Sequence, residues 1–314
     1  MRFEVTILGS GSALPTSLRN TTAQVLNILE RFFLIDCGEG CQLQMRRLSV
    51  PFNKINRAFI SHMHGDHFFG LFGLLSTYNL MGRKKTFYIH AHKEIKPMLD
   101  AVLKPDVFNW SFRIEVLPLK FENPEIIFED AKVKVTSFPL RHSIPVCGFL
   151  FEEKQRLRNV MKEAVVDMHL SIKEINDLKN GFDIIRNGIT YENTKLTTNP
   201  YPVRKYAFIT DTLKCSYVSE IINKVDLLYH EATYLHKDID LARSSCHSTA
   251  IQAAQIAADS GVKKLLLGHF SSRYPNPSDI ELEARTVFDN SFAISDGDIY
   301  VLDLDKSRLP DSYM

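Results

Sequence analysis

Ser61-His62-Met63-His64-Gly65-Asp66-His67 is the stretch that decides the fold, because it places three imidazoles and one carboxylate within six residues after the apolar run 57–60. Histidines are rarely clustered for packing, since each buried imidazole needs hydrogen-bond partners, whereas one zinc ion accepts several neutral imidazoles. His62 and His64 can point the same way from an extended segment, and Gly65 permits the turn that re-aims Asp66 and His67. The stretch therefore predicts a metal site with two pairs of ligands.

Three further candidate ligands each follow an apolar, strand-like run: His142, Asp211 and His269. Strand ends are where layered α/β proteins place their chemistry. One zinc ion needs about three protein ligands and a water, so these residues and the local cluster offer enough donors for two ions. Any one of these histidines alone would be read as an ordinary core or surface residue, but together they favour a metal centre. Four histidines outside these patterns are not expected to bind zinc: His90, His92, His169 and His236.

Strand-like runs dominate the first half of the chain and return in the second, with helical candidates between them. The predicted strands are 3–8, 23–28, 32–35, 57–61 and 86–90, several within 112–151, and then 206–210, 227–230 and 264–267. The predicted helices are 40–47, 68–80, 93–103 and 248–259, the last with a possible cap at His247-Ser248. This pattern predicts two similar halves of mixed β and α structure.

The interval 152–196 differs from its surroundings because it is dense in charge and shows helical spacing at 156–170 and 172–178. It interrupts an otherwise sheet-rich run, and we interpret it as an inserted arm. The composition leaves a second interpretation open, in which this interval is a surface helical hairpin that only covers a sheet edge.

The bulk composition is that of a globular protein. The 314 residues are 45% hydrophobic and 24% charged, and no apolar run reaches the roughly 18 residues of a membrane span. The N-terminus enters a strand pattern without an export signal, which predicts a cytoplasmic protein. The five cysteines are scattered and never spaced Cys-x-x-Cys, so neither a disulfide framework nor a zinc ribbon is indicated. The formal charge of +1 means that any nucleic-acid phosphates must be met by local basic clusters.

These residues, taken together, resemble the ribonuclease Z family of the metallo-β-lactamase superfamily along the whole chain. The histidine stretch alone specifies only the superfamily, and the motifs His230-Glu231-Ala232-Thr233 and His247-Ser248-Thr249 point to the tRNA-processing branch. The other matching segments are 8–15, 19–20, 34–40, 142–149, 209–212 and 268–274. The resemblance implies an α/β four-layer αβ/βα sandwich formed by a single domain, 1–314, with the arm 152–196 as a tRNA-binding exosite.

The resemblance also implies a two-zinc centre. One zinc would be held by His62, His64 and His142, the second by Asp66, His67 and His269, and Asp211 would bridge both. Two such zincs generate hydroxide near neutral pH and clamp the attacking and leaving oxygens. The implied reaction is hydroxide attack on a phosphodiester, which removes the 3′ trailer of precursor tRNA and leaves a 3′-hydroxyl. Asp66 would also serve as general base for the water.

The leaving ribose 3′ oxygen needs a proton or a positive neighbour, and the resemblance assigns this role to His247, oriented by Glu231. The alternatives are that Glu231 is a helix-start carboxylate and His247 a helix cap. Arg19 and Arg273 flank the site elements and are candidate RNA contacts, because such cations position phosphates.

The interval 151–182 departs from the family pattern, since the bacterial arm is typically rich in glycine and proline, whereas this one has only Gly181 and no proline. A dimer partner could cover it, and the resemblance implies a homodimer. The alternative function is a two-zinc phosphodiesterase that acts on small cyclic or nucleotide-like diesters and needs no arm. A metal-stabilised binding protein is disfavoured, because all seven ligand positions and the Glu231 and His247 pair are present.

Overall fold

The computed structural model describes residues 2–104 and 109–304 and divides into two units. The first unit comprises residues 2–152 and 205–302, and the second comprises residues 153–204 with 303–304. Within the described ranges, no helix is both long enough and apolar enough to cross a membrane.

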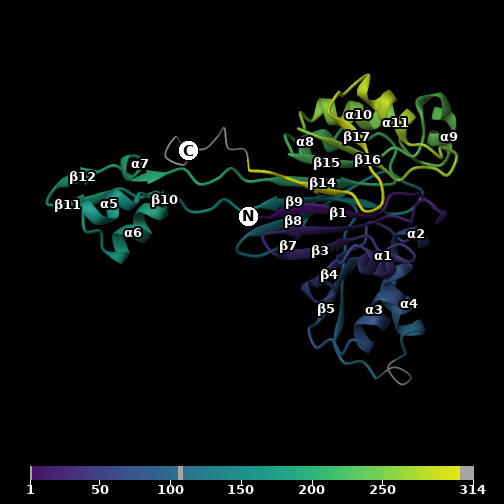
Figure 1. Ribbon diagram of the computed structural model, residues 1–314, viewed down its shortest axis with the longest axis horizontal. Helices are drawn as coiled ribbons and strands as arrows, with labels where there is room; N and C mark the ends of the chain where they lie inside the picture. Colours follow the sequence, from purple (N-terminus) through teal and green to yellow (C-terminus); the bar gives the residue numbers. More distant parts are fainter. Residues whose placement is uncertain (1, 105–108, 305–314) are drawn as a thin grey trace. The chain divides into compact units, whose positions relative to one another are not determined.

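Seven strands of the first unit form one sheet in the order β18-β1-β2-β3-β4-β5-β6 (Figure 1). They are β1 (Phe3–Gly9), β2 (Ala23–Ile28), β3 (Arg31–Ile35), β4 (Ile55–Phe59), β5 (Phe87–Ala91), β6 (Ile114–Pro118) and β18 (Ile299–Val301). β1 to β3 pair antiparallel, β18 pairs antiparallel with β1, and β3 to β6 pair in parallel. The five strands predicted between residues 3 and 90 are confirmed to within two residues at each end.

A second sheet of seven strands has the order β17-β16-β15-β14-β9-β8-β7. Its strands are β7 (Glu125–Glu129), β8 (Val133–Pro139), β9 (Cys147–Glu153), β14 (Lys205–Ile209), β15 (Leu227–Glu231), β16 (Leu265–Gly268) and β17 (Ser291–Ala293). The neighbours β14, β15, β16 and β17 are parallel, so their carboxyl ends meet at one edge. β14 pairs antiparallel with β9, and this pairing sets Lys205 opposite Glu152.

Apolar side chains between the sheets and outside them give the unit four layers. The Phe59 ring of the first sheet lies 5.7 Å from Phe149 and 5.5 Å from Phe151 of the second, measured between centroids. Helices cover the outer faces of both sheets (Figure 1), with one apolar cluster under the helices of the first half. The predicted four-layer αβ/βα sandwich is therefore confirmed.

The helices of the first unit are α1 (Cys41–Arg47), α2 (Gly65–Phe68), α3 (Gly70–Leu80), α4 (Ile95–Val102), α8 (Val218–Ile221), α9 (Ile239–Ser244), α10 (Ala250–Asp259) and α11 (Ser278–Arg285), with 3-10 turns η1 (Phe52–Lys54) and η2 (His236–Asp238). Among them, α1, α3, α4 and α10 lie within the predicted ranges 40–47, 68–80, 93–103 and 248–259, whereas α2, α8, α9 and α11 were not predicted.

Two helix predictions in the first unit need correction at their starts. The predicted helix 68–80 is split at Phe69, because Gly70 packs so closely on Gly38 that a Cβ atom would lie 2.0 Å from the Gly38 carbonyl oxygen. The predicted cap of α10 at His247-Ser248 is wrong. Thr249 caps the helix in a capping box with Gln252, while the Ser248 hydroxyl donates to the Thr212 carbonyl at 2.6 Å. His247 therefore does not cap α10, and its side chain contacts Glu231 instead.

The second unit consists of short elements around a small core. They are β10 (Asn159–Val160), α5 (Lys162–Asp167), α6 (Ile172–Lys179), β11 (Ile184–Arg186), β12 (Ile189–Tyr191), α7 (Asn193–Leu196) and β13 (Thr197–Thr198). Its buried apolar cluster comprises Leu170, Leu178 and Ile184. The prediction of a helix over 172–178 is confirmed, with a capping box at its start.

The predicted helix over 156–170 is wrong for its first half. β10 pairs with β13, and the Arg158 guanidinium donates to the Thr197 hydroxyl at 2.7 Å and to the Asn199 side chain at 2.6 Å. This pairing between residues about forty positions apart overrides the local helical spacing, so that only α5 remains of the predicted helix.

Candidate metal centre

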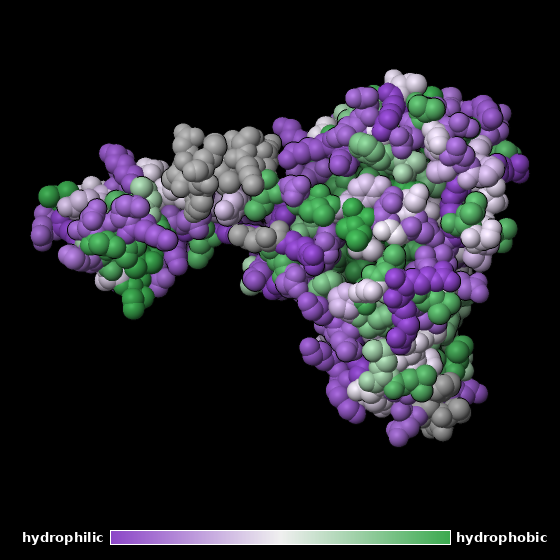
Figure 2. Space-filling model, viewed as in Figure 1, coloured by the Kyte–Doolittle hydropathy of each residue, from purple (hydrophilic) through white to green (hydrophobic). Residues whose placement is uncertain are grey.

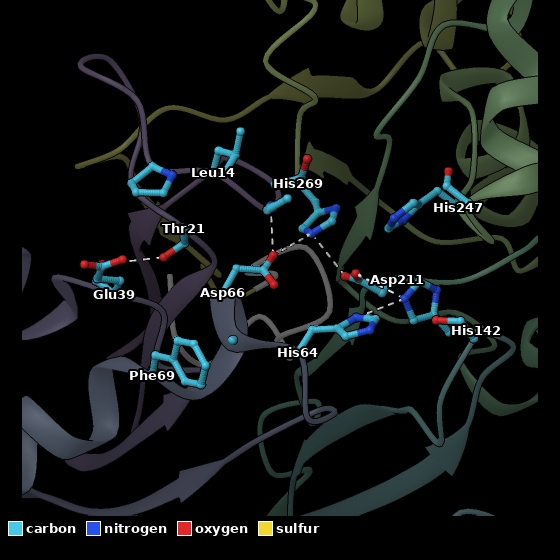
Figure 3. Close-up of a pocket in the computed structure, with 16 residues that line it drawn as sticks. Leu14, Thr21, Glu39, His64, Asp66, Phe69, His142, Asp211, His247 and His269 are labelled. Atoms are coloured by element: carbon cyan, nitrogen blue, oxygen red, sulfur yellow. Dashed lines mark hydrogen bonds and ion pairs between the residues drawn. The ribbon is translucent and has the colours of Figure 1, made fainter.

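The seven predicted metal ligands all come from segments that leave the ends of strands or from the short helix α2. His62 and His64 follow β4, and Asp66 and His67 lie in α2. The remaining three, His142, Asp211 and His269, follow β8, β14 and β16. Parallel strands present their carboxyl ends at one edge, which is why residues distant in sequence converge there. Five of the seven, together with His247, line a pocket of about 550 Å³ (Figure 3).

The first group of donors comprises His62, His64, His142 and Asp211, whose ligand atoms lie within 4.8 Å of one another. Nδ1 of His64 lies 3.0 Å from Nε2 of His62 and 3.2 Å from Nε2 of His142. Three ring nitrogens this close can share one cation. Oδ2 of Asp211 completes the group, at 3.6 Å from His62 and 3.8 Å from His142.

The second group comprises Asp66, His67 and His269. Oδ2 of Asp66 lies 3.3 Å from Nε2 of His67 and 3.7 Å from Nε2 of His269. The other oxygen of Asp211, Oδ1, lies 3.3 Å and 3.2 Å from the same two nitrogens. Asp211 therefore offers one oxygen to each group, which is the arrangement of a bridging carboxylate.

The chemistry of these side chains fits a pair of divalent ions. The Nε2 atoms of His67 and His269 are buried and make no hydrogen bond, and they lie 3.2 to 3.7 Å from the carboxylate oxygens of Asp66 and Asp211, so these donor atoms converge as ligands of one cation would. Five imidazoles and two carboxylates form a donor set that suits zinc and related metals. Burial lowers the pKa of His62 well below 6.5, which favours the neutral, metal-binding form of the ring.

The electrostatics of the second group also favour a cation. Burial lowers the pKa of His67, but the carboxylates of Asp211, Asp36 and Asp66 outweigh burial and raise it well above 6.5. Burial raises the pKa of Asp66 and of Asp211, and the surrounding imidazoles lower both below their ordinary value. The carboxylates remain ionised, and they stabilise positive charge at this point.

Hydrogen bonds behind the ligands fix their orientation. Asp36 is fully buried and accepts from Nδ1 of His67 at 2.7 Å, from the Ser61 amide at 2.7 Å and from the Ser61 hydroxyl at 2.9 Å. His269 contacts the Thr233 hydroxyl through Nδ1 at 2.9 Å. Each bond sets the tautomer of its ring and turns Nε2 toward the pocket. The sequence motifs include Asp36 and Thr233, but sequence reasoning assigned no role to either.

Four non-glycine residues at the centre adopt a left-handed backbone. The φ angles are 53° at Asp36, 40° at Asp211, 58° at Cys246 and 58° at His269. The Cys246 carbonyl lies 2.9 Å from Nδ1 of His142, so this unusual conformation also supports a ligand. Such conformations persist only where the surrounding structure enforces them, and they cluster at functional sites.

Glu231 and His247 are brought together beside the metal donors. Nδ1 of His247 lies 3.0 Å from Oε1 of Glu231, and the His247 ring centroid lies 5.1 Å from that of His142. The buried Glu231 carboxylate also accepts from the amides of Thr212 and Ser248. Burial raises the pKa of Glu231, but His247 and other neighbours lower it to about 2. Burial lowers the pKa of His247, but Glu231 raises it to about 9.

The two predicted RNA-contacting arginines lie outside the residues that line the pocket. The Arg19 guanidinium donates to the carbonyls of Tyr274 and Pro275 at 3.0 Å and 2.7 Å, and it lies over the Phe270 ring. It thus ties the loop before β2 to the loop after β16. Arg273 is exposed in that second loop. The four histidines set aside by sequence reasoning belong to none of the metal-compatible groups found in the described residues.

A two-metal donor set at the edge of a four-layer αβ/βα sandwich defines a metallo-β-lactamase-fold hydrolase. A family model described as Anti-Pycsar protein Apyc1 matches residues 3–281. Ribonuclease Z of Bacteroides thetaiotaomicron is 43% identical over 288 residues, covering 91% of each chain. Ribonuclease Z of Porphyromonas gingivalis is 40% identical over 295 residues, covering 94% of this chain and 97% of its own.

The structure of human tRNase Z, short form, is 25% identical with a TM-score of 0.70, covering 96% of this chain and all of the other. The metallo-β-lactamase fold protein YhfI from Bacillus subtilis shares the fold, at 16% identity and a TM-score of 0.67, covering 96% and 99% of the two chains. The chain belongs to the family of the matching model and, by its curated relatives, to the ribonuclease Z family. It is therefore an endoribonuclease.

Proposed function

We propose that this enzyme removes the 3′ trailer of precursor tRNA by hydrolysing one phosphodiester and leaving a 3′-hydroxyl on the tRNA. The observation that carries the proposal is the pair of donor groups that share Asp211, with the Glu231–His247 pair beside them. The names of the relatives, ribonuclease Z and tRNase Z, support the choice of substrate.

Two zinc ions are the proposed metals. His62, His64 and His142 would hold one, Asp66, His67 and His269 the other, and Asp211 would bind both. When bound, such a pair supplies a hydroxide near neutral pH and neutralises the charge that develops on the phosphate. The buried Nε2 atoms of His67 and His269, which make no hydrogen bond and lie beside the carboxylates of Asp66 and Asp211, support this assignment.

The proton transfers are assigned to two residues of the chain. Asp66 accepts a hydrogen bond from the Ala13 amide at 2.9 Å, which fixes the carboxylate that would take the proton of the attacking water. His247 would donate a proton to the departing ribose 3′ oxygen. Glu231 supports this role, because its carboxylate keeps the His247 imidazole protonated at neutral pH.

The second unit is the proposed tRNA-binding exosite, which corresponds to the arm predicted at 152–196. RNA helices are recognised mainly by shape and by backbone contacts. A groove on this unit is lined by Arg156, Arg158 and Lys179 among others, and these cations suit phosphates. Arg158 keeps its position through Thr197 and Asn199, so that its charge is presented without a large loss of side-chain freedom.

The predicted homodimer and the cytoplasmic location stay predictions. Exposed apolar side chains on the second unit suit a protein contact as well as they suit RNA, and Figure 2 shows a group of hydrophobic residues there beside hydrophilic ones. These exposed residues are Leu157, Val166, Ile172, Phe182, Ile185 and Ile189.

A second candidate function is hydrolysis of small cyclic or nucleotide-like diesters. All residues that line the metal pocket belong to the first unit, so a small diester could reach the metals without the arm. The matching family model is described as Anti-Pycsar protein Apyc1 and not as ribonuclease Z, so we retain this second candidate.

End-mapped cleavage of a labelled precursor tRNA by the zinc-loaded protein separates the two candidates. The same assay includes Asp211→Ala, His247→Ala and a small bis-aryl phosphodiester. Metal-dependent cutting at the tRNA 3′ boundary, lost in Asp211→Ala and strongly reduced in His247→Ala, is the expected result. Turnover of the small diester with the tRNA left intact would move the assignment to the second candidate.

A further inference from the structure

The metal pocket has two chemically different ends. One end carries His142 and His247, and the other carries the exposed apolar side chains of Leu14, Pro15 and Phe69 together with Thr21 and the exposed Glu39 carboxylate. Figure 3 shows Leu14 and Phe69 on opposite sides of Asp66, with His247 far from both. Leu14 is 65% exposed and Phe69 is 54% exposed, although both border a site for an anionic ester. Large apolar surface kept open at a polar site indicates contact with an apolar part of a ligand.

The Phe69 ring is held in place, so its exposure is not the result of a loose side chain. Phe69 lies between α2 and α3, and its ring packs on Gly65 so closely that a Cβ atom there would lie 2.5 Å from the ring carbon Cε2. The Phe68 ring contacts it edge to face at 4.8 Å between centroids. One face of the Phe69 ring is thus fixed beside the metal ligands His64 and Asp66.

The loop that presents Leu14 and Pro15 is also anchored. The Ala13 amide donates to Asp66 at 2.9 Å, and the Ser12 amide donates to the Phe270 carbonyl at 3.1 Å. Arg19 holds the far end of the loop through the carbonyls of Tyr274 and Pro275. The loop with Leu14 and Pro15 is therefore held by hydrogen bonds, whereas Phe69 is held by packing on Gly65 and Phe68.

Two nucleosides flank the phosphate that is cut, and the pocket has one end for each. The upstream ribose ends in the 3′ oxygen that would receive a proton from His247, which places that nucleoside at the His247 end. The downstream nucleoside, attached through its 5′ oxygen, is left with the end that holds Leu14, Pro15 and Phe69. Its uncharged and planar part is the base, and aromatic side chains bind bases by stacking.

We propose that Phe69, at the same end of the pocket as Leu14, is a stacking subsite for the base of the first trailer nucleotide. This inference rests on the proposed function, since it places a precursor tRNA across the metal centre. Every base has a π-face, so the subsite holds the nucleotide without reading its identity. Its role is to position the scissile phosphate over the metals from the downstream side, opposite the contact made by His247.

The test compares two precursor tRNAs that differ only at the first trailer nucleotide, which carries either its base or an abasic ribose. kcat/KM is measured for the zinc-loaded wild type, Phe69→Ala, Phe69→Leu and Phe69→Trp. The control is Leu282→Ala, which removes an exposed apolar side chain of the first unit that does not line the metal pocket. Phe69→Leu keeps apolar volume without a ring, and thermal unfolding of each variant checks the fold.

The wild type should cut the base-bearing substrate about tenfold more efficiently than the abasic one, the size expected for one stacked base. This ratio should fall to about one in Phe69→Ala, fall most of the way in Phe69→Leu, and persist in Phe69→Trp and in the control Leu282→Ala. An unchanged ratio in folded Phe69→Ala and Phe69→Leu, or no ratio in the wild type, would overturn the subsite. Absence of cutting at the tRNA 3′ boundary by the wild type on both substrates would instead overturn the proposed function, and the subsite with it.

Discussion

The metal centre and the second unit are built by opposite strategies. The centre gathers residues from distant segments and fixes them with buried charged groups, of which Asp36 and Glu231 each accept three or more hydrogen bonds. The second unit has a small apolar cluster and is held largely by half-buried polar pairs such as Arg186–Glu174, with one buried pair, Arg204–Glu153, at its base. Exposed pairs contribute little to stability, whereas breaking a buried charged network is costly. Chemistry should therefore fail abruptly when the centre is changed, and substrate binding should decline by degrees when the second unit is changed.

The largest effect should follow from Asp211→Ala, which breaks the centre and leaves the second unit intact. Asp211 offers an oxygen to each donor group, so both metals lose a ligand at once. kcat/KM should fall by more than about 10³-fold, since even a single oxyanion-stabilising donor is worth about 10²–10³. Metal content, measured by elemental analysis, should fall below two ions per chain. A variant with two ions and near-normal turnover would contradict the bridging role.

Glu231→Gln should sharpen the comparison by changing one charge inside the centre. In the wild type the pKa of His247 is raised to about 9, so the proton donor is present at neutral pH and is lost as pH rises through about 9. Without the carboxylate, burial should lower that pKa toward or below 6.5, and the alkaline limb of the kcat/KM profile should move to lower pH. The loss at pH 8 should be about 10²-fold, as expected for one general acid. An alkaline limb that does not move would exclude His247 as the proton donor.

Removing the second unit tests the other side of the comparison. Glu152 and Lys205 are direct neighbours on β9 and β14, so residues 153–204 can be replaced by Asn-Gly, which favours a tight hairpin turn. The kcat/KM for precursor tRNA, relative to that for a bis-aryl phosphodiester, should fall by about 10²-fold, because linked contacts contribute at least that much. The same relative kcat/KM in the shortened chain would show that the second unit does not bind tRNA.

The smallest effect should come from Asp36→Asn, because Asp36 contacts the proposed ligand His67 and does not itself belong to a donor group. The amide oxygen still accepts from Ser61, but the charge that supports His67 is gone. Metal affinity, measured by competition with a chelator, should weaken by about tenfold, the lower end of the range for such supporting residues. Retention of wild-type affinity would show that the Asp36 charge is dispensable.

The sequence was sufficient for the residues whose chemical type reveals their role. His62, His142, Asp211 and the other predicted ligands stand out because imidazoles and carboxylates after strands have few other uses, and the structure brings them together, while metal binding by each of them stays a prediction. Asp36 and Thr233 were missed as supporting residues, since their roles depend on which ring the fold sets against them. Arg19 was predicted to meet RNA, which stays a prediction, and the structure adds that its guanidinium also donates to two loop carbonyls.

Local pattern also failed where distant pairing decides the structure. The helical spacing of 156–170 is real, yet β10 pairs with β13 and takes the first half of that range. Ser248 has the residue type of a helix cap, but its hydroxyl bonds to the Thr212 carbonyl, and Thr249 caps the helix. In both cases a partner far along the chain outweighs the neighbours in sequence.

The left-handed backbone at Asp36, Asp211, Cys246 and His269 limits how far this enzyme can be made more robust. Each such residue costs about 1–3 kcal/mol, which together is a large part of the roughly 5–15 kcal/mol that holds a typical domain folded. Glycine would relieve the backbone at Asp211 or His269 but would remove a side chain that we propose as a metal ligand. Efforts to raise the melting temperature should therefore begin in the second unit and at the surface of the first. Substitutions that relieve the strained backbone at the centre would increase stability but reduce activity.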